Sequence, residues 1–206
     1  TKQITDWQND RDLIADRLPR WNQLVALLKF AADLPVAAEV QPEVTAIEKD
    51  RKLLANPDPV PGIVDKLTCA LRTALNEAQT KFSTDYETRL ETLTESPTWK
   101  QITQPQRHEI LGANGIREMP KIAVGTTEEV LDTLRHTKLS ELRAMSDALP
   151  TRFQNAAAAA AKLLEPKAQY ISLPGGTIQN ETDLQAWLDD VKGRVLAKLK
   201  DGPVIL

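Results

Sequence analysis

The sequence predicts a mainly α-helical protein: a helical bundle with one long coiled-coil-like helix and a small C-terminal β-α-β element. Two observations lead to this class. Apolar residues recur at steps of three and four along most of the chain, which is the period of one face of a helix. The hydrophobic fraction of 41% and the charged fraction of 27% are those of a globular protein. Only 4% of the residues are aromatic, so we expect an aliphatic core.

The first predicted helix covers residues 4–34. Its apolar face consists of Leu13, Ile14, Leu18, Trp21, Leu24, Val25 and Leu28. Pro19 lies inside this run, and a proline costs about 3 kcal/mol in a helix interior. We therefore expect a break or kink near Leu18, with Pro19 beginning a second segment. A short helix over 43–55 follows, and then a proline-rich turn at 56–62.

The longest predicted helix runs from Pro61 to about Glu95. Its apolar residues follow a near-heptad spacing and begin with Val64, Leu67, Leu71, Ala74 and Ala78. At 1.5 Å per residue such a helix is about 50 Å long. We expect it to pair along its length with the segment 4–34, or to project towards a partner protein.

Several shorter helices are predicted in the second half of the chain. Ser96 has the position of an N-cap for a short helix. Thr126 and Glu129 have the spacing of a capping box, which predicts a helix from there to about residue 145, with a jog near Thr137 as an alternative. A separate helical segment is expected to begin at Ser146 and Asp147, with Pro150 in or just after its first turn and an unbroken run over 151–165. Its alanines suit a central position because small residues allow close approach of neighbouring helices.

The tail differs in composition from the rest of the chain. Residues 169–173 have strand character, Asn180 begins a last helix, and residues 204–206 form an apolar end. If the two short strands pair, the intervening helix makes them parallel. The alternative is two extended segments that do not pair.

Two regions are predicted along the chain. The alternative is that both belong to one continuous domain. Residues 1–122 are a helical region that contains the long helix 61–95, and residues 123–206 are a helical region that ends in the β-α-β tail. No apolar run reaches the length of a transmembrane helix, and the polar first residues are unlike a signal peptide. We expect a cytoplasmic protein, and a C-terminal domain cut from a longer chain rather than a chain that lost its Met.

The charge balance argues against a generally basic nucleic-acid-binding protein. Lys and Arg number 26 against 29 Asp and Glu, a net charge of −3. Local basic clusters occur in the first helices and in the last one, and they comprise Arg11, Arg17, Arg20, Lys49, Arg51 and Lys52, and Lys192, Arg194, Lys198 and Lys200. Acidic residues intervene in both clusters, so we expect solvated helix faces rather than a DNA-binding surface.

No catalytic, cofactor-binding or metal-binding residue is assigned from the sequence. The phosphate-loop pattern is absent, and the single cysteine, Cys69, excludes an internal disulfide and a cysteine-cluster zinc site. Cys69 lies between apolar positions of the long helix, which predicts a half-buried packing residue. His108 and His136 are too far apart to form a metal site by spacing, and we expect both to be exposed on helices.

The remaining chemical groups have structural explanations. Glu128, Glu129 and Asp132 lie in the first turns of a predicted helix, where the helix dipole favours carboxylates. The four tryptophans are expected in the core by default, with an interface anchor as the alternative for one of them; they are Trp7, Trp21, Trp99 and Trp187.

A resemblance to a known family lies in the last third of the chain. It is carried by the segments 147–153 (DALPTRF), 163–168 (LLEPKA), 173–174 (LP), 182–188 (TDLQAWL) and 200–206 (KDGPVIL). Over residues 125–206 these segments resemble the C-terminal end of the large P-loop proteins of BREX phage-defence systems, the BrxC/PglY family. The first 120 residues share only a general helical character with it.

The resemblance implies a bacterial protein whose ATPase motor lies outside this segment, in a complex that also contains a DNA methyltransferase. No catalytic residue is carried over, because the motor motifs are absent here. We therefore expect a non-catalytic interaction or assembly module without a cofactor. Its partners would be other subunits of the defence complex or a second copy, with no membrane contact. The alternative is a helical module that binds or positions DNA for the same complex.

Overall fold

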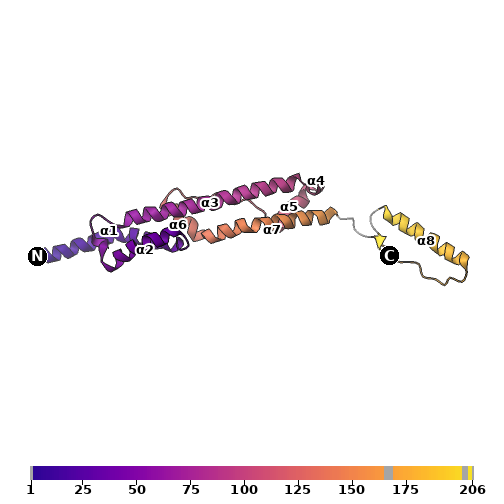
Figure 1. The fold of residues 1–206 in the computed structure, drawn as a ribbon, viewed down its shortest axis with the longest axis horizontal. Helices are drawn as coiled ribbons and strands as arrows, with labels where there is room; N and C mark the ends of the chain where they lie inside the picture. The colour runs from indigo at the N-terminus through magenta and orange to yellow at the C-terminus, as the bar shows by residue number, and fades with distance from the viewer. Residues whose placement is uncertain (1, 165–168, 201–203, 206) are drawn as a thin grey trace. The chain divides into compact units, whose positions relative to one another are not determined.

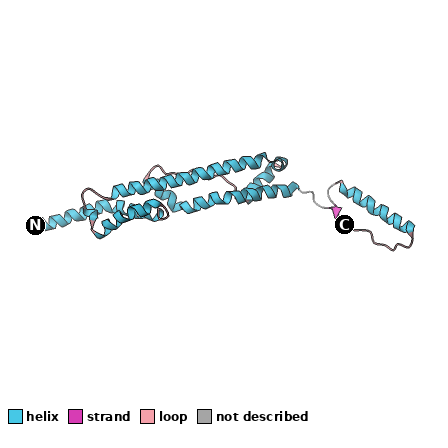
Figure 2. Ribbon diagram, in the orientation of Figure 1, coloured by secondary structure: helices cyan, strands magenta, loops and turns pink. Residues whose placement is uncertain are grey.

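The protein is helical over most of its length in a computed structural model that describes residues 2–164, 169–200 and 204–205 (Figure 1, Figure 2). This confirms the predicted mainly α-helical class. The elements are α1 (Lys2–Phe30), α2 (Pro35–Lys49), the 3-10 helix η1 (Lys52–Leu54), α3 (Val60–Glu95), α4 (Pro97–Gln101), α5 (Gln104–Ala113), α6 (Thr127–His136), α7 (Leu139–Leu164), β1 (Gln169–Tyr170), α8 (Glu181–Leu199) and β2 (Val204–Ile205).

The chain divides into two compact units, and neither is a continuous stretch of sequence. The first consists of Thr1–Thr92 and Gly115–Phe153, and the second of Leu93–Asn114 and Gln154–Leu206. The long helices α3 and α7 each begin in the first unit and end in the second. The predicted division into regions 1–122 and 123–206 stays a prediction.

The first unit has the expected aliphatic core, to which α1, α2, α3, α6 and α7 contribute. Its largest fully buried side chains are Leu24, Leu27, Val40, Val60, Ile63, Leu67, Leu71, Leu75, Val130, Leu134, Leu142 and Leu149. Burying an aliphatic side chain of this size stabilises the fold by roughly 1.5–3 kcal/mol. Five elements thus depend on one set of contacts.

The long helix α3 has nearly the predicted bounds, and in the first unit it lies beside α7 (Figure 1). Lys81 Nζ is 3.3 Å from Asp147 Oδ1. Further along, the rings of Tyr86 and Phe153 meet edge to face with centroids 5.9 Å apart. The expected partner segment 4–34 contributes only its second half to the shared core.

The first helix is not broken at Pro19, and this prediction was wrong. α1 continues through the proline from Lys2 to Phe30. Buried residues lie on both sides of it, Arg17 before and Leu24 after, and their contacts stabilise both halves of the continuous helix. Proline removes one backbone donor, a local cost that tertiary packing can exceed.

Two other helix boundaries differ from the prediction for related reasons. α2 begins at Pro35, which occupies the first turn, and it ends at Lys49 instead of continuing to residue 55. α7 runs unbroken through Pro150, so the expected separate helix from residue 146 is part of it. Only one side of its alanine run is buried, at Ala156 and Ala160, so the run is not surrounded by other helices.

The predicted helix caps are confirmed. Thr126 Oγ1 accepts a hydrogen bond from Glu129 N at 3.2 Å, and Glu129 Oε2 accepts from Thr126 N at 3.0 Å, which completes the capping box of α6. Ser96 caps α4, and Asn180 caps α8 by accepting from Asp183 N at 2.9 Å. These helix caps could be predicted from the sequence because each cap is an interaction between residues close together in the chain.

Two very short strands pair with each other near the C-terminal end of the second unit. β1 and β2 are parallel, with Gln169 opposite Val204 and Tyr170 opposite Ile205, and α8 connects them. The ladder is two residues long, so a β-α-β element larger than this pairing stays a prediction. Leu206 and the segments 165–168 and 201–203, on which parts of the prediction and of the resemblance fall, lie outside the described residues.

Alkaline pH is expected to destabilise the first unit through Tyr86. Its burial, with a smaller effect of the Glu118 carboxylate, raises the pKa of this phenol above 10.0. The unfolded chain therefore loses the proton at lower pH than the folded one, and stability declines as pH rises from about 10 towards the folded value. Urea unfolding at pH 9 and pH 11 measures this loss. Tyr86→Phe should reduce the decline, and an equal decline in both proteins would exclude Tyr86 as a cause.

Candidate functional site

An exposed apolar stripe runs along α1. Its members follow alternating steps of three and four residues, which is heptad spacing. Arg11 occupies the heptad position between Trp7 and Ile14 and is not apolar. The stripe consists of Ile4, Trp7, Ile14, Leu18 and Val25, all of them exposed. The Trp7 side chain is 66% exposed, which is unusual for a tryptophan in a folded protein.

The same helix carries a second apolar side, which is buried. Leu24, Leu27 and the adjoining Ala31 lie in the core of the first unit. The single apolar face expected from the sequence is therefore divided: Leu24 is buried, whereas Ile14, Leu18 and Val25 face outward. Residues 2–12 are exposed throughout, so the first three turns of α1 have no packed side.

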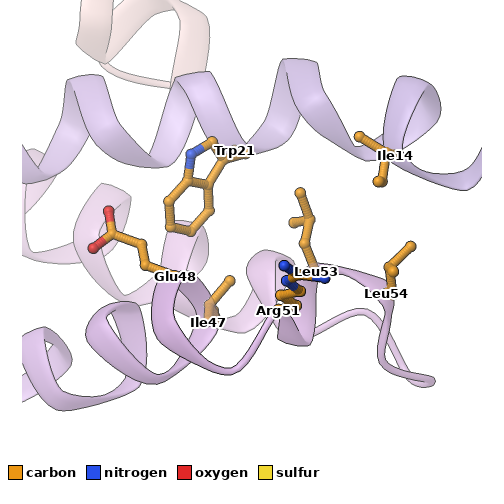
Figure 3. A pocket seen from close by; sticks show the side chains of 7 residues that line it. All are labelled: Ile14, Trp21, Ile47, Glu48, Arg51, Leu53 and Leu54. Carbon is orange, nitrogen blue, oxygen red and sulfur yellow. The ribbon is translucent and has the colours of Figure 1, made fainter. Parts of the chain in front are cut away.

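A groove of about 540 Å³ continues the stripe (Figure 3). Ile14 and Trp21 line it from α1, and Trp21 follows Leu18 in the heptad register. Facing them across the groove are the end of α2 and the turn that follows it. These facing residues are Ile47, Glu48, Arg51, Leu53 and Leu54.

The far wall of the groove depends on a sharp reversal of the chain after α2. Arg51 has a φ of 54°, in the left-handed region that non-glycine residues seldom adopt. η1 follows directly, and it places Leu53 and Leu54 opposite α1. The groove thus exists because the chain turns back at Arg51 rather than continuing as a helix.

Arg17 fastens this turn to α1. The residue is only 7% exposed. Its Nη1 donates to the carbonyl oxygens of Leu53 at 2.7 Å and Ala55 at 2.6 Å. Its Nε lies 3.8 Å from Asp58 Oδ2, and Arg20 Nη1 donates to the same oxygen at 2.7 Å. Asp58 Oδ1 in turn accepts from the backbone N–H of Val60 at the start of α3.

The first predicted basic cluster is largely neutralised by these and similar contacts. Arg17 and Arg20 are held by Asp58, Arg11 pairs with Asp12 at 2.8 Å, and Lys52 lies 3.3 Å from Asp50. What remains along the exposed start of α1 is acidic: residues 2–16 hold four aspartates against Lys2 and Arg11. The surface beside the stripe therefore repels phosphate groups.

The groups considered for catalysis do not converge. His108 and His136 are exposed, as expected, and Glu129 is used in the cap of α6. Cys69 is exposed on α3, so the prediction of a half-buried thiol was wrong. Over residues 2–164, 169–200 and 204–205, no three His, Cys, Asp or Glu side chains are grouped so that they could hold a metal ion.

The tryptophans take different positions. Trp99 is buried, as expected for a core residue, and Trp187 donates from Nε1 to the carbonyl oxygen of Pro174 at 2.7 Å. Trp7 is the exception to the core expectation, and Trp21 lines the groove. A sequence signal for this site exists in the heptad spacing of the apolar residues from Ile4 onward. These residues form a face of α1 next to its buried face.

Comparison with known proteins gives no relative: no protein-family model, no curated protein and no solved structure matches the chain. Within the part of the chain that the structure describes, every helix is too short or too polar to cross a lipid bilayer.

Proposed function

We propose that this chain is a non-catalytic interaction module that binds an amphipathic helix of another protein subunit. The observation that carries the proposal is the exposed stripe on α1 and its continuation into the groove beside Trp21. An uncovered apolar surface of this extent marks an interaction site in a folded protein. Trp7, exposed near the start of the stripe, has the size and position of a binding anchor.

The spacing and the charge of the surface define the partner. A repeat of 3.5 residues is complementary to another helix, because knobs at that spacing fit the holes of a facing helix. The groove beside Trp21 extends the contact with a helical ligand's apolar side chains. The excess of aspartates along residues 2–16 favours a partner with Lys or Arg beside its apolar seam.

The cellular setting in this proposal comes from the resemblance to the BrxC/PglY family. On that basis we propose that the module acts in the bacterial cytoplasm, in a BREX phage-defence complex, with another subunit of that complex as partner. Co-purification of the methyltransferase subunit with the native full-length protein, lost on Trp7→Asp, is the expected result. If the variant still retains the methyltransferase subunit, then that subunit does not bind the α1 stripe.

A designed peptide tests the binding chemistry directly. The probe has four heptads with Leu at both core positions and Lys at the flanking positions, and its twin carries Glu in place of Lys. Titration calorimetry should show binding of the Lys peptide, and Trp7→Asp should weaken it tenfold or more, as loss of a binding anchor does. The Glu peptide should bind more weakly, because its charges have the sign of the α1 aspartates.

The matched control is Leu163→Asp, which alters a similarly exposed apolar residue on α7. It should leave peptide affinity unchanged. Equal affinity of the wild type and Trp7→Asp for the Lys peptide, or equal affinity for both peptides, contradicts the proposal.

The alternative function is DNA binding or positioning. It is less favoured because most of the first basic cluster is paired with aspartates and the exposed start of α1 carries more acidic than basic residues. A gel-shift assay at 50 mM and 200 mM salt separates the two, since phosphate contacts make affinity fall steeply with salt. Tight, salt-sensitive binding of duplex DNA would favour the alternative.

A further inference from the structure

A second uncovered apolar surface lies on α8, in the second unit. One side of α8 is half-buried through Trp187, Val191 and Val195, and the helix contacts β2. Four leucines of this helix are exposed, and they alternate with the half-buried valines on the same broad face: Leu184, Leu188, Leu196 and Leu199. Because they recur at steps of four, eight and three residues, the four leucines share about one third of the helix surface.

The charges of this segment are separated into two halves. Residues 181–190 contain four acidic residues and no basic one, and residues 191–200 contain four basic residues and no acidic one. The acidic residues are Glu181, Asp183, Asp189 and Asp190, and the basic residues are Lys192, Arg194, Lys198 and Lys200. The helix dipole explains such a bias only in the first and last turns. Asp189, Asp190, Lys192 and Arg194 lie in the middle.

We infer that α8 associates with α8 of a second copy of this chain, in antiparallel orientation. In that orientation the acidic half of each helix faces the basic half of the other, whereas a parallel pair would oppose like charges. A two-fold axis between Val191 and Lys192 also brings Leu184 of one copy opposite Leu199 of the second. It brings Leu188 opposite Val195 in the same way. Charge and apolar side chains are therefore complementary in one arrangement.

The charge pattern favours a second copy over a different protein. A foreign partner needs an independently matched sequence, whereas this segment already contains both complementary halves. Part of the charge is used within the helix, since Arg194 Nε lies 3.0 Å from Asp190 Oδ2. The apolar contact therefore supplies most of the affinity, and the charges set the orientation.

The contact is small, and this determines how it should behave. A helix of 19 residues is about 28 Å long, so a single pair buries less than the roughly 1,200 Å² of a standard interface. We expect a weak, reversible dimer that dissociates on dilution. High salt should weaken it by a few fold only, because exposed charges are screened but apolar contacts are not.

Sedimentation equilibrium of the whole chain over a wide concentration range tests the association. The wild type should be a reversible dimer, and Leu188→Glu should weaken dimerisation at least tenfold. Circular dichroism checks that the variant stays helical, which is expected because Leu188 is exposed. Trp7→Asp, the variant that tests the α1 surface, should leave the dimer intact. A strict monomer, or a dimer that Trp7→Asp abolishes and Leu188→Glu does not, overturns the inference.

Cross-linking tests the orientation. In a Cys69→Ser background, a protein with Leu184→Cys mixed with one carrying Leu199→Cys should form a disulfide-linked heterodimer. Each protein alone should form far less. Preferential self-linkage of the Leu184→Cys protein would show a parallel pair and overturn the orientation.

Discussion

Leu71→Ala is expected to lower the free energy of unfolding by about 3 kcal/mol, within the range observed for truncation of buried leucines. Leu71 is 0% exposed and lies in the core that α1, α2, α3, α6 and α7 share. Removing three carbon atoms leaves a cavity that rigid helices on several sides cannot close. Urea unfolding followed by circular dichroism measures the loss as a lower midpoint with an unchanged slope.

Leu163→Ala is the matched control, since it makes the same chemical change at an exposed position of α7. Its cost should stay within about 0.5 kcal/mol. Equal losses for the two variants would mean that the core of the first unit does not determine the stability measured.

The helices were largely predictable because their signals are local. An apolar period of 3.6 residues marks α3 over its whole length, and the capping box of Thr126 and Glu129 marks the start of α6. Each of these signals depends on contacts within a few residues. Nothing elsewhere in the chain is needed to interpret them.

The rule that a proline ends or begins a helix gave wrong helix boundaries in this chain. Pro19 and Pro150 both lie inside helices, although each was expected to end or begin one. Buried side chains on both sides of each proline explain this: Arg17 and Leu24 around the first, and Leu149 and Phe153 around the second. The free energy of several such contacts exceeds the cost of one missing hydrogen bond, and that balance is set by tertiary packing.

The groove could not be predicted from the sequence, because it depends on where distant segments meet. Its far wall requires the left-handed turn at Arg51 and the approach of η1 to α1. Arg17 was grouped with the basic surface residues, whereas it is buried and bound to two carbonyl oxygens 36 and 38 residues away. The apolar residues from Ile4 to Val25 are present in the sequence, but Ile14, Leu18 and Val25 were assigned to the same apolar face as the buried Leu24. Sequence spacing alone did not separate the two apolar faces of this helix.

Arg17→Met is expected to destabilise the protein by about 3 kcal/mol, because removing one partner of a buried charged network leaves the others unsatisfied. Methionine keeps much of the side-chain volume, so little of this loss comes from packing. The carbonyl oxygens of Leu53 and Ala55 lose their donor, and the half-buried Asp58 keeps only Arg20 and Val60 N–H. Urea unfolding measures the change.

Arg20→Met distinguishes the buried network from a surface ion pair. Arg20 also binds Asp58, but its side chain is 44% exposed, and exposed pairs contribute about 0–1 kcal/mol. Arg17→Met should in addition speed amide hydrogen exchange over residues 51–55 and weaken binding of the Lys-flanked peptide, because the wall formed by Leu53 and Leu54 is no longer fastened to α1. If Arg17→Met is as stable as Arg20→Met and exchange over 51–55 is unchanged, then Arg17 does not hold the groove in shape.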